Sequence, residues 1–242
     1  MSNPIDYYYI CRQLNNFMSK VFISFLCFFT FNSIHAQIHE IGVFLGGSNY
    51  IGDVGSTTYT APNEPAFGIL YKWNKSPRHA YRFSYTQSQI SGNDRDSNEP
   101  GRHNRGYSFT NDIKELSAGL EFNFFDFNLH EERTKFSPYV YSGLSYFMYD
   151  DLYIESGETH KNDTKSSIAI PMTIGVKTNF LRNFVLGLEV GARYTFTDNI
   201  DGSHPSDNST IMFGNLNNND WYVFTGMTLT YTFGKKPCYC AD

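Results

Sequence analysis

The chain has 242 residues, a formal net charge of −5 and 17% aromatic residues, yet its mean hydropathy is negative at −0.41. This length suits one ordinary domain with a sizeable core. The mild negative charge leaves no basic stripe of the kind that binds nucleic acid, so we expect no nucleic-acid partner. An aromatic chain that is polar on average fits either a soluble β-protein or a membrane barrel.

An apolar run extends from Val21 to Phe31, with Lys20 before it and the small residue Ala36 after it. A basic residue, an apolar run of about 11 residues and a small residue form the pattern of a secretory signal peptide. The run is too short for a spanning helix, which needs about 20 residues. We therefore predict a signal peptide over residues 1–36, with Met18 as an alternative start, and a mature chain beginning at Gln37.

Removal of residues 1–36 leaves Cys238 and Cys240 as the only cysteines, both close to the C-terminus. Two cysteines do not make a disulfide scaffold, and a bridge across one intervening residue would be strained. Two thiolates without further ligands also make only half of a zinc site. We expect residues 235–242 to form a tail after the folded domain, and we predict neither a metal nor a cofactor.

Period-2 alternation of apolar and polar residues, which is typical of half-buried strands, recurs about eight times in the mature chain. The last segment is the clearest, with Met227, Leu229 and Tyr231 on one face and Thr228 and Thr230 on the other. The fifth segment is the weakest, because Tyr, Ser and Gly fall on both of its faces. The predicted strands are 39–50, where Phe44 breaks the alternation, 67–73, 81–88, 116–124, 139–149, 168–180, 184–196 and 226–233.

The connections between these segments alternate in length. Those over 51–65, 91–112, 150–167 and 198–220 are long and rich in Asn, Asp, Ser, Gly and Pro, whereas those over 74–78, 128–136 and 181–183 are shorter. Long loops outside the cell and short turns in the periplasm are typical of outer-membrane barrels. The order predicts an all-β fold over residues 37–234: an eight-stranded antiparallel up-and-down transmembrane β-barrel in the outer membrane, with both termini periplasmic.

The two faces of the predicted strands differ in kind. One face carries large apolar residues, and the other is small and polar with scattered charges. Because lipid must meet apolar side chains, the polar face is predicted to line the lumen, where an unpaired charge would be costly. The alternative is a soluble all-β protein whose apolar face forms the core. The predicted lumen charges are Glu40, Lys72, Arg82, Glu121, Lys177, Glu189 and Arg193.

Aromatic residues collect at the predicted strand ends, where outer-membrane barrels carry two aromatic girdles. The periplasmic girdle is predicted to contain Trp73, Phe124, Phe136, Tyr139, Phe180, Phe184, Tyr231 and Phe233. The outer girdle is predicted to contain Tyr50, Tyr149, Tyr194, Phe196 and Trp221.

Two groups of acidic loop residues invite a metal-binding interpretation. Residues 92–99 place oxygen ligands at alternate positions, in the manner of a calcium loop, but without the glycine and terminal carboxylate of an EF-hand. We predict a solvated surface loop here, and the same for Asp198, Asp201 and Asp207.

Catalysis and conduction have little support in the sequence. The histidines of the mature chain lie at strand ends or in loops, and none forms a recognisable pair with a serine, so we expect no enzyme and no small-molecule substrate. The interior of eight strands is just filled by side chains, so we expect no open pore.

Several segments, in their order and spacing, resemble the PorG family, the outer-membrane barrel component of the type IX secretion system of the Bacteroidetes. The resemblance covers nearly the whole mature chain and departs in the tail from Lys235 to Asp242. It implies a non-enzymatic protein that contacts a periplasmic ring formed by the lipoprotein PorK and its partner PorN. The resembling stretches are Glu40–Asp53, Gln89–Asp94, Glu115–Phe125, Ser137–Tyr141, Ile174–Lys177, Leu186–Glu189, Thr195–Asp198 and Asp220–Tyr222.

A free-standing structural or adhesive barrel is the competing function. An adhesin would depend on the outer loops around Asp94 and Asp201, whereas a secretion component would depend on the periplasmic turns and the tail. The longest such turn carries charges suited to a rim contact, although an ordinary solvated turn explains them equally well. The charges are those of Glu131, Glu132, Arg133 and Lys135.

Overall fold

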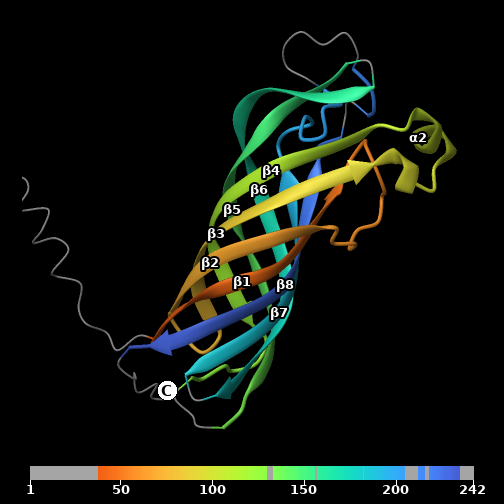
Figure 1. The fold of residues 1–242 in the computed structure, drawn as a ribbon. Helices are drawn as coiled ribbons and strands as arrows, with labels where there is room; N and C mark the ends of the chain where they lie inside the picture. The colour runs from red at the N-terminus through yellow and green to blue at the C-terminus, as the bar shows by residue number, and fades with distance from the viewer. Residues whose placement is uncertain are drawn as a thin grey trace, which may run out of the picture. The chain divides into compact units, whose positions relative to one another are not determined.

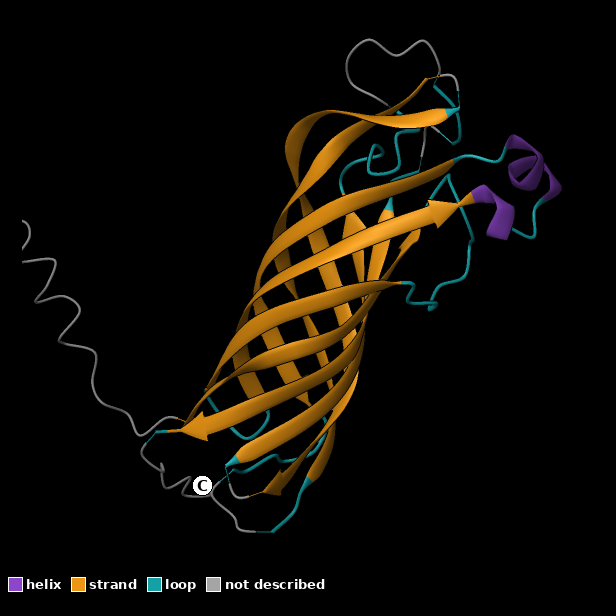
Figure 2. Ribbon diagram, viewed as in Figure 1, coloured by secondary structure: helices purple, strands orange, loops and turns teal. Residues whose placement is uncertain are grey.

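The computed structural model describes residues 38–129, 133–155, 157–181, 183–204, 212–215 and 218–234. These residues form a closed barrel in which every strand pairs antiparallel with its neighbours in sequence and β8 pairs back onto β1 (Figures 1 and 2). The predicted eight-stranded antiparallel barrel is therefore confirmed. The predicted signal peptide and the tail over 235–242 lie outside the described residues.

The eight strands differ greatly in length. They are β1 (Ile38–Ile51), β2 (Glu64–Asn74), β3 (His79–Asn93), β4 (Ser108–Asn123), β5 (Phe136–Glu155), β6 (Glu158–Leu181), β7 (Phe184–Thr195) and β8 (Trp221–Phe233). A short 3-10 helix η1 (Asp94–Asp96) and the helix α2 (Pro100–Arg105) lie between β3 and β4. None of the helices in the described part of the chain is long and apolar enough to cross a membrane.

The start of β1 and the end of β8 lie at the same end of the barrel, because His39 pairs with Phe233. We call this the lower end; it carries the turn 75–78 and the described residues of the connections 124–135 and 182–183. The opposite, upper end carries η1, α2 and the longer loops (Figure 1). Closure gives each strand two hydrogen-bonded neighbours, so the ring has no free edge along its common length.

The predicted long loop over 150–167 is wrong. The strands β5 and β6 instead continue as a two-stranded ribbon, with pairing from Tyr149 and Lys165 up to Glu155 and Glu158 and a register shift after Asp151. Most of this part of β6 is exposed on both faces. A strand with water on both sides needs no alternation of apolar and polar residues, which is why the sequence pattern does not reveal it.

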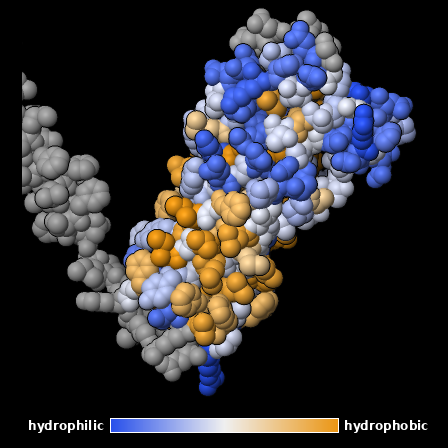
Figure 3. Space-filling view, in the orientation of Figure 1, coloured by the Kyte–Doolittle hydropathy of each residue, from blue (hydrophilic) through white to orange (hydrophobic). Residues whose placement is uncertain are grey.

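Burial alternates along the strands, but the polarity of the two faces changes with height. Near the lower end the outward residues are apolar and the inward ones are polar, whereas near the upper end the inward residues are apolar. In the space-filling view the lower part is mostly hydrophobic and the upper part mostly hydrophilic (Figure 3). The buried apolar cluster of the upper part includes Phe44, Ile90, Phe109, Ile113, Phe147, Ile200, Tyr222 and Phe224.

Candidate functional site

An apolar belt surrounds the lower part of the barrel. Every strand contributes outward-facing, exposed side chains to it, such as Ile174 at 66% and Ile69 at 61% exposure. Along β4 and the residue after it, the belt runs from Leu116 to Phe124, about 20 Å along the axis at a rise of about 3.3 Å per residue and a tilt of about 40°. The belt consists of Ile41, Val43, Leu45, Phe67, Ile69, Tyr81, Phe83, Tyr85, Leu116, Leu120, Phe124, Val140, Leu144, Tyr146, Met148, Ile168, Ile170, Met172, Ile174, Val176, Leu188, Met227, Leu229 and Tyr231.

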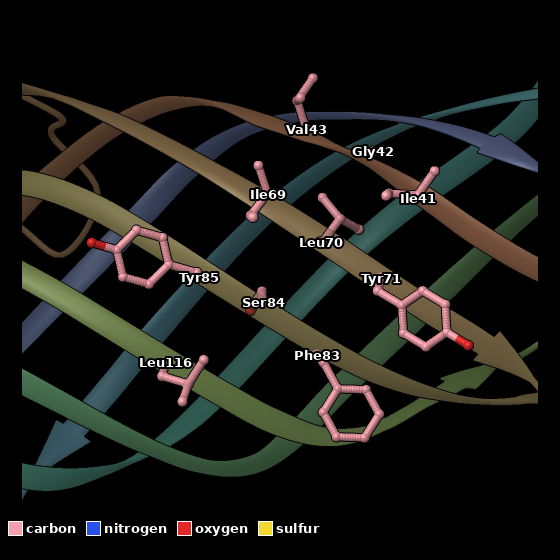
Figure 4. A pocket seen from close by; sticks show the side chains of 10 residues that line it. All are labelled: Ile41, Gly42, Val43, Ile69, Leu70, Tyr71, Phe83, Ser84, Tyr85 and Leu116. Atoms are coloured by element: carbon pink, nitrogen blue, oxygen red, sulfur yellow. The ribbon is translucent and has the colours of Figure 1, made fainter.

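The surface of the belt is uneven. A hollow of about 460 Å³ lies over β1 to β4, among outward side chains such as Ile41, Ile69, Phe83 and Leu116 (Figure 4). Its lining also includes the inward-facing Gly42, Leu70 and Ser84. The hollow is almost entirely apolar, so it belongs to the belt and offers no set of polar groups that could orient a substrate.

Three aromatic residues predicted for the girdles face inward instead. Tyr139 is 1% exposed and lies in the lumen, while Tyr50 and Tyr149 are 4% and 5% exposed inside the upper part. Phe136 and Phe196, in contrast, are exposed as predicted. Tyr139 and Tyr141 both face inward on β5. Because large residues lie on both faces of this strand, the sequence pattern alone did not show which face points into the barrel.

All seven predicted lumen charges lie inside the barrel, each at 6% exposure or less. Glu121 is their centre, because its carboxylate lies 2.8 Å from Nζ of Lys72 and 2.6 Å from Nζ of Lys177. Arg82 approaches the same carboxylate at 3.8 Å. Lys72 and Lys177 come from β2 and β6, which do not pair with β4, so they meet Glu121 inside the ring that the sheet forms.

The remaining lumen charges are also paired. Arg82 binds Glu189 through two nitrogens, at 2.7 and 2.8 Å, and the hydroxyl of Tyr139 donates to the same carboxylate at 2.5 Å. Glu40 accepts hydrogen bonds from Asn74 at 2.8 Å and from Thr230 at 2.6 Å. Bidentate and charge-assisted bonds of this kind offset the cost of keeping charges away from water.

Glu115 belongs to this network, although the sequence analysis missed it. It is fully buried and accepts from Nε of Arg193 at 3.2 Å and from the hydroxyl of Tyr222 at 2.6 Å. Glu115 lies six residues before Glu121, so on one strand the two side chains point to the same face. The predicted strand, however, began one residue after Glu115. With Glu115, the network formed with the seven predicted charges contains four carboxylates and four cations.

Large inward side chains fill the narrow interior opposite glycines. A Cβ on Gly175 would lie 2.6 Å from the ring of Tyr139, and one on Gly226 would lie 2.9 Å from the ring of Phe44. Phe44, which broke the predicted alternation, thus occupies space that a glycine leaves free. Side chains just fill an eight-stranded barrel, and these inward rings pack closely against the opposite parts of the wall.

The predicted surface loop over 92–99 is exposed at most of its residues, such as Arg95 and Asp96, but Asp94 is buried where the upper loops fold over the barrel mouth. Asp94 is fully buried and accepts hydrogen bonds from the N–H groups of Gly55 and Tyr107 and from Arg105. Burial alone would raise the pKa of Asp94, but these hydrogen bonds outweigh it and hold the pKa below its usual range. Asp94 therefore joins loops that are distant in sequence.

Asp201, also predicted to be solvated, is fully buried and accepts from the N–H groups of Val54 and Ser203. Asp198 is half-buried, and its pKa is raised to about 6 by burial and by the nearby charges of Asp53 and Asp201. Asp207 lies outside the described residues. Asp94 and Asp201, two of the acidic residues that suggested calcium, thus serve as acceptors for backbone N–H groups of the cap, which sequence spacing could not reveal.

The lower end carries the connection 124–135, which contains the four residues predicted as a contact site. Arg133 is exposed and Lys135 is half-buried, while Glu131 and Glu132 lie outside the described residues. The side chain of Asn179 on β6 bonds to the backbone of this segment at two places. It donates to the carbonyl of Arg133 and accepts from the N–H of Lys135.

A residue of this turn that the sequence analysis missed is Phe127. It is only 4% exposed, and Nζ of Lys177 lies 4.8 Å from its ring centre. Its neighbours Phe125 and Asp126 are exposed. No periodicity marks one inward aromatic in an irregular turn, so only the structure reveals it.

No curated protein matches the sequence. The chain is similar in structure to Ail, the attachment invasion locus protein of Yersinia pestis, determined with the heparin analogue sucrose octasulfate, at 14% identity, over 82% of this chain and 99% of that chain, with a TM-score of 0.45. It is also similar to Neisserial surface protein A, at 11% identity over 82% and 96%, with a TM-score of 0.44.

A third similar structure is the N-terminal β-barrel domain of OprF from Pseudomonas aeruginosa, at 12% identity, over 82% of this chain and 98% of that chain, with a TM-score of 0.42. The family model described as "Domain of unknown function (DUF6089)" matches residues 19–242. The chain belongs to this family.

Proposed function

We propose that this chain is a non-enzymatic β-barrel of the bacterial outer membrane that serves the type IX secretion system by contacting a periplasmic ring complex from its lower end. The observation that carries the membrane assignment is the apolar belt, to which all eight strands contribute. Soluble monomers rarely expose contiguous apolar patches larger than a few hundred Å². The belt is continuous, and polar residues resume above and below it. This arrangement matches the lipid-facing surface of outer-membrane barrels.

The filled lumen supports an indirect part in secretion. Tyr139, Tyr141 and the ion pairs around Glu121 occupy the interior, so the barrel has no room for a protein substrate. A secretion role must then be exerted through a surface outside the bilayer. The resemblance to the PorG family names the pathway, and PorK- and PorN-like proteins are the proposed partners.

The lower end supports such a contact. Both barrel termini lie there, and signal processing would leave the N-terminus of an exported chain in the periplasm. The turn 124–135 presents Phe125, at 57% exposure, and the exposed side chain of Arg133. An apolar contact with charges at its edge is the usual composition of a protein interface.

Localisation is the first test. The protein is expected to fractionate with outer membranes and to migrate faster on a gel when unheated in mild detergent, because a closed barrel resists unfolding. Recovery in the soluble periplasm without a heat-dependent shift would refute the membrane assignment and, with it, the proposed role.

The secretion role has a separate test. Deletion of the gene is expected to leave type IX cargo in the periplasm, and the intact gene should restore export. A photo-crosslinking residue at position 133 is expected to capture ring subunits, whereas one at Arg95, an exposed arginine of η1 at the upper end, is not. Normal export in the deletion strain, with crosslinks from position 95 alone, would favour the adhesin.

That second candidate, an adhesive or structural barrel, is favoured by the rigidity of the upper end. Arg105 binds Asp94 and the carbonyl of Asp53, and Arg102 binds the carbonyl of Gly52, so η1 and α2 are held in place. Exposed residues on fixed loops make a recognition surface with little ordering cost. Loss of surface attachment on mutation of these loops, with export intact, would support it.

A further inference from the structure

One fully buried serine of the lumen has a hydroxyl group that the protein does not satisfy. Ser145 is 0% exposed and faces inward on β5, with the same parity as Tyr141 and Phe147. Its hydroxyl oxygen has no hydrogen-bond partner among the described residues, whereas the buried hydroxyl of Ser137, on the same strand, donates to the carbonyl of Pro138. Because buried polar groups are nearly always hydrogen-bonded, a bound molecule is the expected partner of Ser145.

The β-ladder next to Ser145 lacks one hydrogen bond. The pairing of β5 with β6 is interrupted for two residues, and the register on either side sets Gly143 opposite Pro171. Ile168 of β6 accepts from the N–H of Phe196, which follows β7, so residues of the other parity direct their backbone groups toward β5. Pro171 has that parity but no N–H to donate. The carbonyl of Gly143 therefore lacks its donor from β6, which leaves an acceptor two residues from Ser145.

A third polar group faces Ser145 from the neighbouring strand. Ser117 of β4 lies directly opposite Ser145 and is 1% exposed. Its hydroxyl bonds the hydroxyl of Tyr141 at 2.6 Å and can make a further bond, because a hydroxyl group has one donor and two acceptor sites. Facing residues of an antiparallel pair have Cβ atoms about 4.5–5.5 Å apart, a span that one water molecule can bridge.

The remaining surroundings of Ser145 are small or apolar. On the β6 side the residue opposite Ser145 is Ala169, which is fully buried. On the outer face of the barrel, Leu144 and Ile170 flank the interrupted ladder and are apolar. The polar groups are thus reached from the lumen, and three of them match the two to four partners that a buried water molecule usually has.

We propose that the lumen binds one water molecule that bridges the hydroxyls of Ser145 and Ser117 and the carbonyl of Gly143. The water links β4, β5 and β6 where Pro171 interrupts the ladder, because a water-mediated hydrogen bond is nearly as favourable in enthalpy as a direct one. This site is a property of the closed barrel and stands whether or not the protein serves secretion.

The test is water-selective magnetisation transfer, measured by NMR on the purified, folded barrel in detergent. In the wild type, protons of Ser145 should receive magnetisation directly from a long-lived water molecule. Ser145→Ala should lose this transfer at position 145, because the water loses one of its three partners. Ser137→Ala is the matched control, since that hydroxyl is equally buried but already bonded within the protein, and it should leave the transfer at Ser145 unchanged.

A second variant guards against a folding defect in Ser145→Ala. Ser117→Ala keeps the Ser145 hydroxyl but removes the one opposite, and it should also weaken the transfer at Ser145. Gel mobility before heating verifies that each barrel is closed. A crystal structure that resolves water should show one molecule within about 2.5–3.0 Å of both hydroxyl oxygens. The proposal is overturned if the wild type shows no direct transfer, if both variants retain it, or if the crystal shows Ser145 bonded directly to the protein.

Discussion

The lower and upper parts of this barrel are built from the same strands with opposite polarity. On β4, Glu121 faces in and Leu120 faces out near the lower end, whereas Ile113 faces in and Lys114 faces out near the upper end. Neither the backbone nor the inward parity changes between these positions. The difference teaches that the solvent around a strand, and not the strand itself, decides which face is apolar.

The physical reason is the location of water. In the upper part water surrounds the barrel, so apolar side chains gather inside, as in a soluble protein. In the lower part the proposed lipid surrounds the barrel, and apolar side chains point out while polar groups pair inside. The change occurs between Tyr85 and Gln87 on β3 and between Leu116 and Lys114 on β4, at similar heights.

The largest expected effect concerns the lumen of the lower part. Glu121→Gln leaves Lys72 and Lys177 buried without their shared counter-charge, which should lower the free energy of unfolding by about 3–5 kcal/mol. Urea unfolding of the barrel in lipid vesicles measures it. Asp112→Asn, on an exposed carboxylate of the same strand, should change little. An equal effect of the two substitutions would contradict a charged lumen.

The next effect concerns the outside of the lower part. Leu188 is 54% exposed within the belt, and Leu188→Arg should lower the free energy of unfolding in vesicles by about 2–4 kcal/mol, because a charge then faces lipid. Gln87→Arg, also outward but above the belt, should cost less than about 0.5 kcal/mol. Thr228→Ser, on the lumen face, should be nearly silent. A tolerant Leu188 with a sensitive Thr228 would indicate a soluble barrel.

A smaller effect is expected in the upper cap. Ile200 is fully buried there, and Ile200→Ala should destabilise the cap by about 2 kcal/mol, the low end for such truncations because a loop can relax around the cavity. Hydrogen exchange of the loop amides measures the opening of the cap. Met212→Ala, at a residue 54% exposed, is the control. Faster exchange in the lower strands after Ile200→Ala would show that the two parts are not independent.

The smallest effect is on pH dependence. Burial, with repulsion from Asp53 and Asp201, raises the pKa of Asp198 to about 6, so the closed cap binds this proton more tightly than the open one. Its stabilising contribution is complete below the ordinary value of 3.8 and is lost as the pH rises through about 6.

Asp198→Asn should therefore weaken the dependence of loop hydrogen exchange on pH between about pH 4 and about pH 7, after correction for the intrinsic rate. Asp94 acts in the opposite sense, because its lowered pKa makes its contribution disappear as the pH falls. If the cap becomes more stable between about pH 4 and about pH 7 only in the Asp198→Asn variant, Asp198 opposes that gain in the wild type, as its raised pKa predicts. Identical pH profiles for the variant and the wild type would contradict this prediction.

Much of the barrel could be predicted from local patterns. Alternation identified a strand at each of the eight places, and the inward parity of residues such as Lys72, Arg82 and Glu189 follows from it. The pattern failed where both faces meet the same solvent, as in residues 158–167 of β6, and where large residues occupy both faces, as with Tyr139. In these places composition carries no information about the face.

The sequence by itself determined the strand number, the closed antiparallel order and the face of each predicted lumen charge, because a residue's parity in a strand is a local property. Only the tertiary structure decided that Glu121 is shared by Lys72 and Lys177, that Asp94 and Asp201 are buried, and that Phe127 is buried beside Lys177. These facts depend on the register of closure and on contacts between loops far apart in the chain, which no local pattern encodes.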